Sequence, residues 1–240
     1  RTNLAITESD GTTTKVNEPG AVLSAAEAAE LSDAVAERAQ FAEWVVMSGS
    51  LPPGLPDSWY SETVAVLRRY GCKVAVDTSD GPLAALAAGL DLAAPDLLKP
   101  NSEELAGLSG VTPESLETAL AQGDPGPVVT AARRLLDRGV GAVLATLGAA
   151  GAVLVDGTGA WLATPPPVQP RSTVGAGDSS LAGYVRADIG GASAPARLQM
   201  AVAYGSAAAA LPGSALPTPA QLNLDDVVVT SIADPSEGVS

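Results

Sequence analysis

The first twenty residues alternate between apolar and polar side chains. This alternation has the period of a β-strand and predicts two strands, at 3–7 and at 12–16. The residues between them, Glu8 to Gly11, include an Asp-Gly pair, which is a strong signal for a hairpin turn. The pattern therefore predicts a small antiparallel ribbon at the start of the chain.

From residue 24 onward the apolar positions change to helical spacing. Ser24 and Glu27 have the spacing of a capping box, and Ala28, Leu31 and Val35 follow on one helix face. Short strands that are apolar throughout then alternate with helices. The expected strands lie at 45–47, 74–76, 97–98 and 142–146, and the expected helices lie near 57–69, 82–88, from 101 onward and 128–138. Strands without a polar face are buried on both sides, so this order predicts a doubly wound, mostly parallel α/β sheet with helices on both faces.

The last third of the chain predicts a hairpin and two closing helices. The hairpin pairs 152–155 with 160–163 around an Asp156-Gly157 turn, and the helices lie near 179–188 and 197–211. The stretches rich in proline and glycine have only the length of loops. We therefore expect two parts, a β-ribbon at 1–20 and one α/β domain at 21–240.

Composition and charge exclude several classes of function. The chain has no His and a single Cys, which rules out a Ser-His-Asp or Cys-His catalytic centre, a His-ligated metal and an internal disulfide. A lone Cys suits a reducing cytoplasm. The net charge of −14 argues against binding to nucleic acid or to an anionic membrane, and no apolar run approaches the roughly 20 residues of a membrane span. We expect a cytoplasmic protein, and an anionic small molecule stays open as its ligand, because a few local donors can outweigh a distant net charge.

Ligands of open parallel sheets bind beyond the carboxyl ends of the strands, so the loops there are the candidate sites. The most informative loop is 173–183. Gly175 and Gly177 free backbone N–H groups to face an anion, and a helix is expected just after them. Asp178 could accept a proton from an attacking hydroxyl. The alternative is a tight turn whose Asp only caps the helix.

A second loop follows the strand at 97–98 and includes Lys99. Asn101 and Glu104 are three residues apart and share one face of the first helical turn. An amide and a carboxylate there could hold the water shell of Mg²⁺, which keeps several waters in proteins. The alternative is a purely structural capping box.

Two further loops also follow strands. The glycines Gly148 and Gly151, after Thr146, would let nucleotide phosphates approach the backbone, although a simple glycine turn between two strands looks the same. The run Ser48-Gly49-Ser50 presents two hydroxyls on a turn, although an ordinary strand-to-helix connection has the same composition. Arg1 could grip a phosphate with two hydrogen bonds or could simply be solvated.

Taken together and in this order, these loops resemble the motifs of the ribokinase-like carbohydrate kinases of the phosphofructokinase B family. Residues 172–185 are similar to the C-terminal signature of that family at nearly every position, with Ser172 in place of the more usual Asp. The other loops fall where the family keeps its remaining motifs. More narrowly, 6–15 and 76–79 resemble the bacterial 1-phosphofructokinases.

The resemblance implies a kinase that uses ATP and Mg²⁺ and converts fructose 1-phosphate to fructose 1,6-bisphosphate. Asp178 would take the proton from the C6 hydroxyl while the N–H groups of Gly175, Ala176 and Gly177 stabilise the transferred group. The remaining implied roles are nucleotide binding by Lys99, Asn101, Thr146, Gly148 and Gly151, water-mediated Mg²⁺ binding by Glu104, and binding of the sugar phosphate by Arg1, Ser48, Gly49 and Ser50. The ribbon would be a lid over the site and the contact surface of a homodimer.

The resemblance leaves alternatives open. A tagatose-6-phosphate kinase or a 6-phosphofructokinase of the same family would share nearly all of these motifs, and a catalytically inactive phosphosugar-binding protein would keep many of them. Family members also carry an N-terminal segment ahead of the position of Arg1. The resemblance therefore implies a truncated chain, in which the domain at 21–240 lacks its N-terminal strands.

Overall fold

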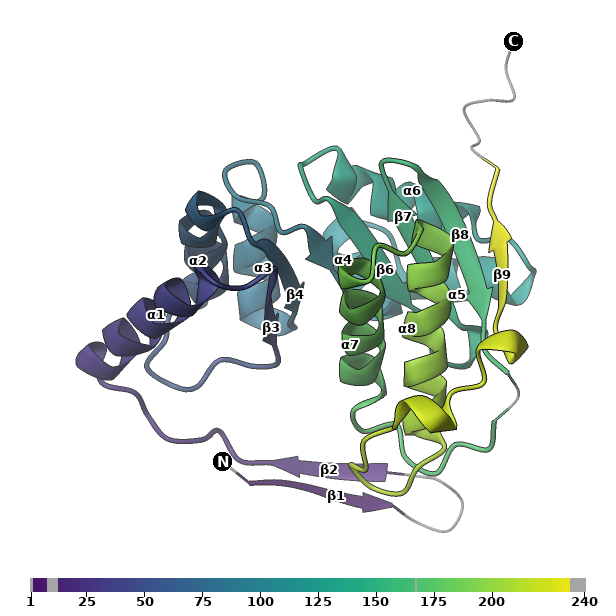
Figure 1. Ribbon diagram of the computed structural model, residues 1–240, viewed down its shortest axis with the longest axis horizontal. Coiled ribbons are helices and arrows are strands. Elements are labelled where there is room, and N and C mark those ends of the chain that lie inside the picture. The colour runs from purple at the N-terminus through teal and green to yellow at the C-terminus, as the bar shows by residue number, and fades with distance from the viewer. Residues whose placement is uncertain (1, 8–12, 167, 234–240) are drawn as a thin grey trace.

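The computed structural model describes residues 2–7, 13–166 and 168–233 and contains two separate sheets (Figure 1). The smaller sheet is an antiparallel ribbon of β1 (Asn3–Thr7) and β2 (Thr13–Asn17). The predicted ribbon is confirmed, although its second strand begins one residue later than the pattern indicated. The predicted turn falls largely on residues 8–12, which lie outside the described residues.

The larger sheet has seven strands in the order of the chain. These strands are β3 (Trp44–Ser48), β4 (Lys73–Asp77), β5 (Leu97–Leu98), β6 (Ala142–Thr146), β7 (Ala152–Asp156), β8 (Gly159–Thr164) and β9 (Val228–Ser231). β3 to β6 run parallel, whereas β7, β8 and β9 continue the sheet in antiparallel pairs. The predicted parallel sheet and hairpin are confirmed, and β9 is an element that the pattern did not predict.

Helices cover both faces of this sheet, as predicted. They are α1 (Ala25–Ala39), α2 (Trp59–Leu67), α3 (Asp80–Gly89), α4 (Ser102–Ser109), α5 (Pro113–Ala121), α6 (Gly126–Leu136), α7 (Ala176–Ile189) and α8 (Ala194–Ala209). One core lies between the sheet and α2, α3, α4 and α6, and a second lies under α7 and α8. The helix α5 was not predicted from the sequence.

Alternate residues of the central strands enter opposite cores. Val74 and Val76 of β4 pack into the first core, whereas Ala75 between them packs into the second. Burial on both faces explains why these strands read as continuous apolar runs. The prediction of complete burial is wrong for β3, where Val46 is 46% exposed, because β3 is the edge strand of the described sheet.

The helices α1 and α7 begin in different ways. The capping box at α1 is confirmed, since the Ser24 side chain accepts from the Glu27 N–H and the Glu27 carboxylate accepts from the Ser24 N–H. The helix α7 begins at Ala176, three residues before the predicted start. Gly175 adopts a left-handed conformation, with φ of 78°, and turns the chain directly into the helix. Asp178 therefore lies within the first turn of α7.

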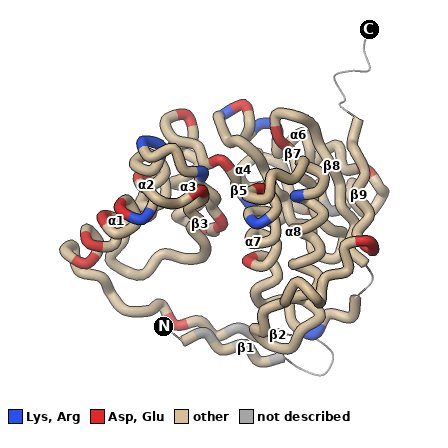
Figure 2. The backbone as a smooth tube through the Cα atoms, in the orientation of Figure 1, with Lys and Arg blue, Asp and Glu red and all other residues tan. Residues whose placement is uncertain are grey.

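Charged residues are spread along the chain, with several acidic residues on α1 (Figure 2). Acidic side chains follow the exposed side of α1, with Glu27, Glu30, Asp33 and Glu37 all exposed. Within the described part of the chain, no helix combines the length and the apolar character needed to cross a membrane.

Candidate active site

The predicted loops meet at one edge of the large sheet. Ser48 ends β3, Asp77 ends β4, Lys99 follows β5 and Thr146 ends β6. Because these four strands are parallel, their carboxyl ends lie along the same edge, and Ser48 and Asp77 are register partners. Asn101 forms a parallel bridge with Thr146, which brings the second and third loops together.

Asp178 reaches this edge from the first turn of α7. The Ser48 hydroxyl donates a hydrogen bond of 2.8 Å to Asp178 Oδ1, across 130 positions of sequence. The residue that caps α7 is Gly175, which has no side chain to offer. The carboxylate is thus engaged by a distant strand, and this contact favours a role at the loop cluster over the alternative role of a helix cap.

Lys99 is a buried cation beside the same turn. Its side chain is 6% exposed, and its Nζ lies 3.1 Å from Asp77 Oδ2. A Cβ added to Gly177 would lie 3.1 Å from the same Nζ, so glycine at 177 leaves room for the ammonium group. Burial raises the pKa of Asp77 above its ordinary value, while the neighbouring Lys99 charge acts to lower it.

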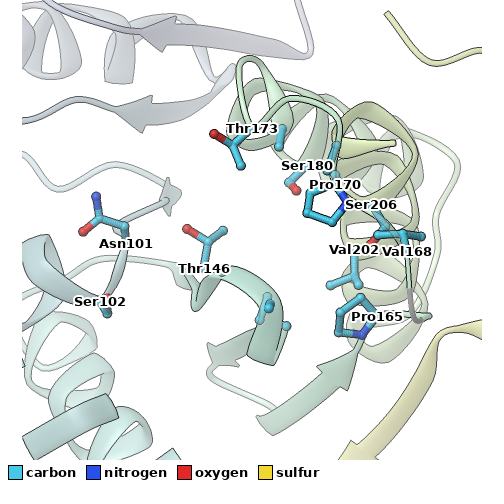
Figure 3. A pocket seen from close by; sticks show the side chains of 18 residues that line it. Asn101, Ser102, Thr146, Pro165, Val168, Pro170, Thr173, Ser180, Val202 and Ser206 are labelled. Atoms are coloured by element: carbon cyan, nitrogen blue, oxygen red, sulfur yellow. The ribbon is translucent and has the colours of Figure 1, made fainter. Parts of the chain in front are cut away.

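A cavity of about 580 Å³ opens between the loops and α8 (Figure 3). Asn101, Ser102 and Thr146 lie on one side of it, and Val168 and Val202 lie on the other. The predicted residues that line it are Asn101, Thr146, Gly148, Gly151, Ala176 and Gly177. This volume falls within the roughly 300–1,000 Å³ of small-molecule pockets.

Sequence analysis missed the wall that α8 contributes to this cavity. Val202, Gly205, Ser206 and Ala209 line it, and they recur at the spacing of one helix face. Gly205 also packs against α7, because a Cβ there would overlap the Ser180 hydroxyl, so the small residues of this face serve helix packing as well as the cavity.

The glycine turn after β6 forms another part of the cavity wall. Gly148 has φ of 58°, and a Cβ there would meet nothing within 4 Å. Gly151 has φ of 106°, and a Cβ there would overlap the carbonyl oxygen of Ala163. Gly151 is therefore required by the fold, whereas Gly148 leaves open space where a ligand can approach the backbone.

A second hollow, of about 510 Å³, lies on the other side of the α7 turn. Its lining consists of Val46, Ser48, Asp178, Leu181, Ala182, Val185, Arg186 and Ile189. Gly177 lines the first cavity, and its neighbour Asp178 lines the second. The first turn of α7 thus stands between the two hollows, with the backbone turn on one side and a carboxylate on the other.

The predicted Ser48-Gly49-Ser50 loop is split between two places. Ser48 lines the second hollow with Asp178, whereas Ser50 lines a separate hollow near Pro19 and Asp80. The Gly49 carbonyl between them accepts hydrogen bonds of 2.9 Å from the hydroxyls of both Tyr60 and Thr78. Sequence analysis assigned no role to either residue: Tyr60 lies in no motif, and Thr78 entered only as part of the run 76–79. Arg1 lies outside the described residues.

The capping box at Asn101 and Glu104 is present in full. The Glu104 N–H donates to Asn101 Oδ1 and the Asn101 N–H donates to Glu104 Oε2, both at 2.8 Å. Burial is the main influence on Glu104 and raises the pKa of its carboxyl. The structural alternative is therefore present, and the role of Glu104 toward Mg²⁺ stays a prediction. Among the described residues, no three Asp, Glu or Cys side chains are grouped to hold a metal ion.

The chain matches the model of the pfkB family carbohydrate kinases over residues 1–221. It is 40% identical to a 1-phosphofructokinase of Rhodobacter capsulatus over 225 residues, which cover 92% of this chain and 67% of that protein. It is 33% identical to the ATP-dependent 6-phosphofructokinase isozyme 2 of Escherichia coli K12 over 218 residues, or 90% of this chain and 66% of that protein.

The fold agrees with these matches. The crystal structure of phosphofructokinase-2 from Escherichia coli, in complex with substrates and products, superposes with a TM-score of 0.77 at 31% identity, covering 91% of this chain and 67% of that one. The chain spans about two thirds of the length of these relatives, and 55% of the length of the 1-phosphofructokinase of Escherichia coli K12. Both the sequence match and the fold show that the chain belongs to the pfkB family of carbohydrate kinases.

Proposed function

We propose that the protein transfers the γ-phosphoryl group of ATP to the C6 hydroxyl of fructose 1-phosphate and forms fructose 1,6-bisphosphate. The observation that carries this proposal is the position of the first turn of α7 between two hollows. A phosphoryl donor in one hollow and an acceptor in the other would meet at this turn. The naming of a 40% identical relative as a 1-phosphofructokinase supports this choice of acceptor.

The first cavity suits a nucleotide. It is large enough, it has an apolar wall from α8, and Gly148 leaves the backbone of the turn after β6 open. Gly177 lines this cavity at the start of α7, and the Lys99 ammonium group lies next to Gly177, so both contribute positive charge toward an anion there. We assign the phosphates of ATP to this part of the cavity, near Lys99, Asn101 and Thr146.

Asp178 is the general base of this proposal. Its carboxylate lines the second hollow and takes the proton of the acceptor hydroxyl, whose oxygen forms a bond to phosphorus as the bond to ADP breaks. The hydrogen bond from Ser48 fixes the direction of the carboxylate. The N–H groups of 175–178, at the start of α7, stabilise the negative charge on the transferred oxygens.

Mg²⁺ fits this site only as an ion that keeps most of its water. The described residues offer no cluster of three acidic side chains, and one oxygen of Glu104 is already bonded to the Asn101 N–H. When bound, the ion would neutralise charge on the phosphates. Glu104 is the residue that we propose to orient its water shell.

The acceptor is tested with a panel of phosphosugars in an assay that couples ADP release to a dye. We expect the highest kcat/KM with fructose 1-phosphate, and lower values with fructose 6-phosphate and tagatose 6-phosphate. A preference for fructose 6-phosphate would support the second candidate, a 6-phosphofructokinase, which the 33% identity to the Escherichia coli isozyme favours. Binding of phosphosugars without ADP release would identify an inactive binding protein.

We further propose that the β1–β2 ribbon is a lid over the site and the contact surface of a homodimer. Leu4, Ile6 and Val16 are each 53% exposed, and Leu4 lies directly opposite Val16 in the ribbon. Residues two apart in a strand share a face, so the three side chains form one apolar surface.

The single cysteine, Cys72, is buried and free, which suits the cytoplasmic location that we propose.

A further inference from the structure

Fold stability alone does not explain the buried ion pair between Asp77 and Lys99. The Lys99 side chain is 6% exposed and the Asp77 side chain 17% exposed, so both charges have lost most of their water. Apolar residues of similar size often give equal or greater stability than such a buried pair. This pair lies at the edge where the functional loops meet, and that position favours a role in the site.

The second neighbour of the Lys99 ammonium is the first turn of α7. Nζ lies close enough to Gly177 that a Cβ there would be 3.1 Å away. The N-terminal end of a 14-residue helix carries positive partial charge, so a cation beside it is unfavourable without a compensating anion. Asp77 supplies that compensation in the protein as it stands.

Asp77 is placed to hold Lys99 and not to touch the reactants. Neither Asp77 nor Lys99 lines the two hollows, but Lys99 lies beside Gly177, which lines the first, whereas Asp77 lies beside Lys99. Burial raises the pKa of Asp77, the neighbouring Lys99 charge lowers it, and the charge of Asp178 raises it. Asp178 in turn takes its hydrogen bond from Ser48, so the two carboxylates have separate partners.

We propose that Asp77 is a positioning residue whose carboxylate fixes the Lys99 ammonium beside the first turn of α7, where both positive groups meet the phosphoryl group in transfer. The proposal rests on the proposed function. It assigns Asp77 an effect on turnover that passes entirely through Lys99.

The first test is the Asp77→Asn variant, which keeps the size of the side chain and removes its charge. We expect kcat to fall about 10²-fold, the cost of losing one aligned positive group, while the KM for the phosphosugar stays within about twofold. The matched control is Asp91→Asn, which breaks the surface ion pair with Arg138, also 3.1 Å long, and should leave both constants unchanged. A wild-type kcat in Asp77→Asn would overturn the proposal.

A second comparison separates positioning from loss of folding. Asp77→Asn leaves a buried ammonium without its partner, and unfolding alone could lower activity. The double variant Asp77→Asn with Lys99→Gln is neutral at both positions and is compared with Lys99→Gln alone. We expect their kcat values to agree within about twofold, because Asp77 has nothing left to position. A further loss of about tenfold in the double variant would show that Asp77 acts independently of Lys99 and would overturn the proposal.

A third measurement does not depend on turnover. The chain contains three lysines, Lys15, Lys73 and Lys99, and an amine-acylating reagent followed by peptide mass spectrometry reports each labelling rate separately. Asp77→Asn should release Lys99 and label it severalfold faster, with Lys73 as the internal control. Unchanged labelling of Lys99 would overturn the proposal. If the wild-type chain turned over no phosphosugar, the proposed function would fail, and faster labelling would still support the pairing that holds Lys99.

Discussion

At the scale of single residues, Asp178 combines a position in the second hollow with a hydrogen bond from Ser48. Asp178→Asn keeps the shape of the side chain and removes its basicity. We expect kcat to fall about 10²–10⁴-fold while the affinity for ATP, measured by calorimetry, changes little. Near-normal turnover in this variant would reduce Asp178 to a structural residue.

Tyr60 contacts the loop that we propose to bind the sugar phosphate. Its hydroxyl shares the Gly49 carbonyl with the Thr78 hydroxyl, and together they fix the loop that begins at Ser48. Tyr60→Phe removes one hydrogen bond of about 1 kcal/mol, so we expect the KM for the phosphosugar to rise about fivefold with kcat retained. Tyr70→Phe, at an exposed position, is the control. An unchanged KM would mean that Thr78 alone holds the loop.

The pH dependence of this contact follows from the environment of the phenol. Burial, and next the charge of Asp77, raise the pKa of Tyr60 above its ordinary value of about 10. The neutral phenol is the donor, so the contact persists at every pH below that raised pKa. We expect the KM for the phosphosugar to show no Tyr60-dependent change between pH 7 and about 9. A rise within that range that disappears in Tyr60→Phe would contradict this assignment.

Residue types at strand ends could be predicted from the sequence more readily than their partners. Asp178 stands out because two glycines precede it. Asp77 also ends a strand, yet its pairing with Lys99 depends on the alignment of β4 with β5, which places residues 22 positions apart side by side. The alternation of apolar residues shows where a strand ends and carries no information about which loop lies next to it.

At the scale of elements, Glu104 in the first turn of α4 has a structural role in the capping box and a proposed role toward Mg²⁺, and one substitution distinguishes them. Glu104→Gln preserves the capping box, because Gln serves equally at the third helical position. We therefore expect the free energy of unfolding to change by less than about 0.5 kcal/mol, while turnover falls and more Mg²⁺ is needed for half-maximal activity. Glu103→Gln, in the same helical turn and exposed, is the matched control. An unchanged Mg²⁺ titration would leave Glu104 with the capping role alone.

The elements that sequence analysis missed are those with few buried side chains. Among the described side chains of α5, Leu116 is the only large one that is fully buried. The strand β9 is mostly exposed and is held by its pairing with β8. By contrast, β4 and β6 lie between two cores, and that environment permits only apolar residues. Burial thus explains why β4 and β6 were predictable, whereas the exposed β1–β2 ribbon was predictable from its alternation and α1 from its capping box.

At the scale of the whole molecule, the β1–β2 ribbon is the surface that we propose to join two copies. A two-stranded ribbon has little stability by itself, and this one presents an apolar face formed by Leu4, Ile6 and Val16. Pairing with the same face of a second copy would cover six half-exposed side chains, worth roughly 5 kcal/mol of association free energy. Exposing this apolar face to water costs free energy, and a dimer through the ribbon would remove that cost.

The triple substitution of Leu4, Ile6 and Val16 by Thr tests the dimer. Thr keeps the β-propensity of the strands and removes most of the apolar area, so the dimer dissociation constant should rise about 10³-fold. We expect light scattering at micromolar concentration to show a dimer for the wild-type chain and a monomer for the triple variant. Val22→Thr, exposed but outside the ribbon, should remain dimeric. A wild-type monomer at these concentrations, or a triple variant that stays dimeric, would show that the apolar face of the ribbon does not hold two copies together.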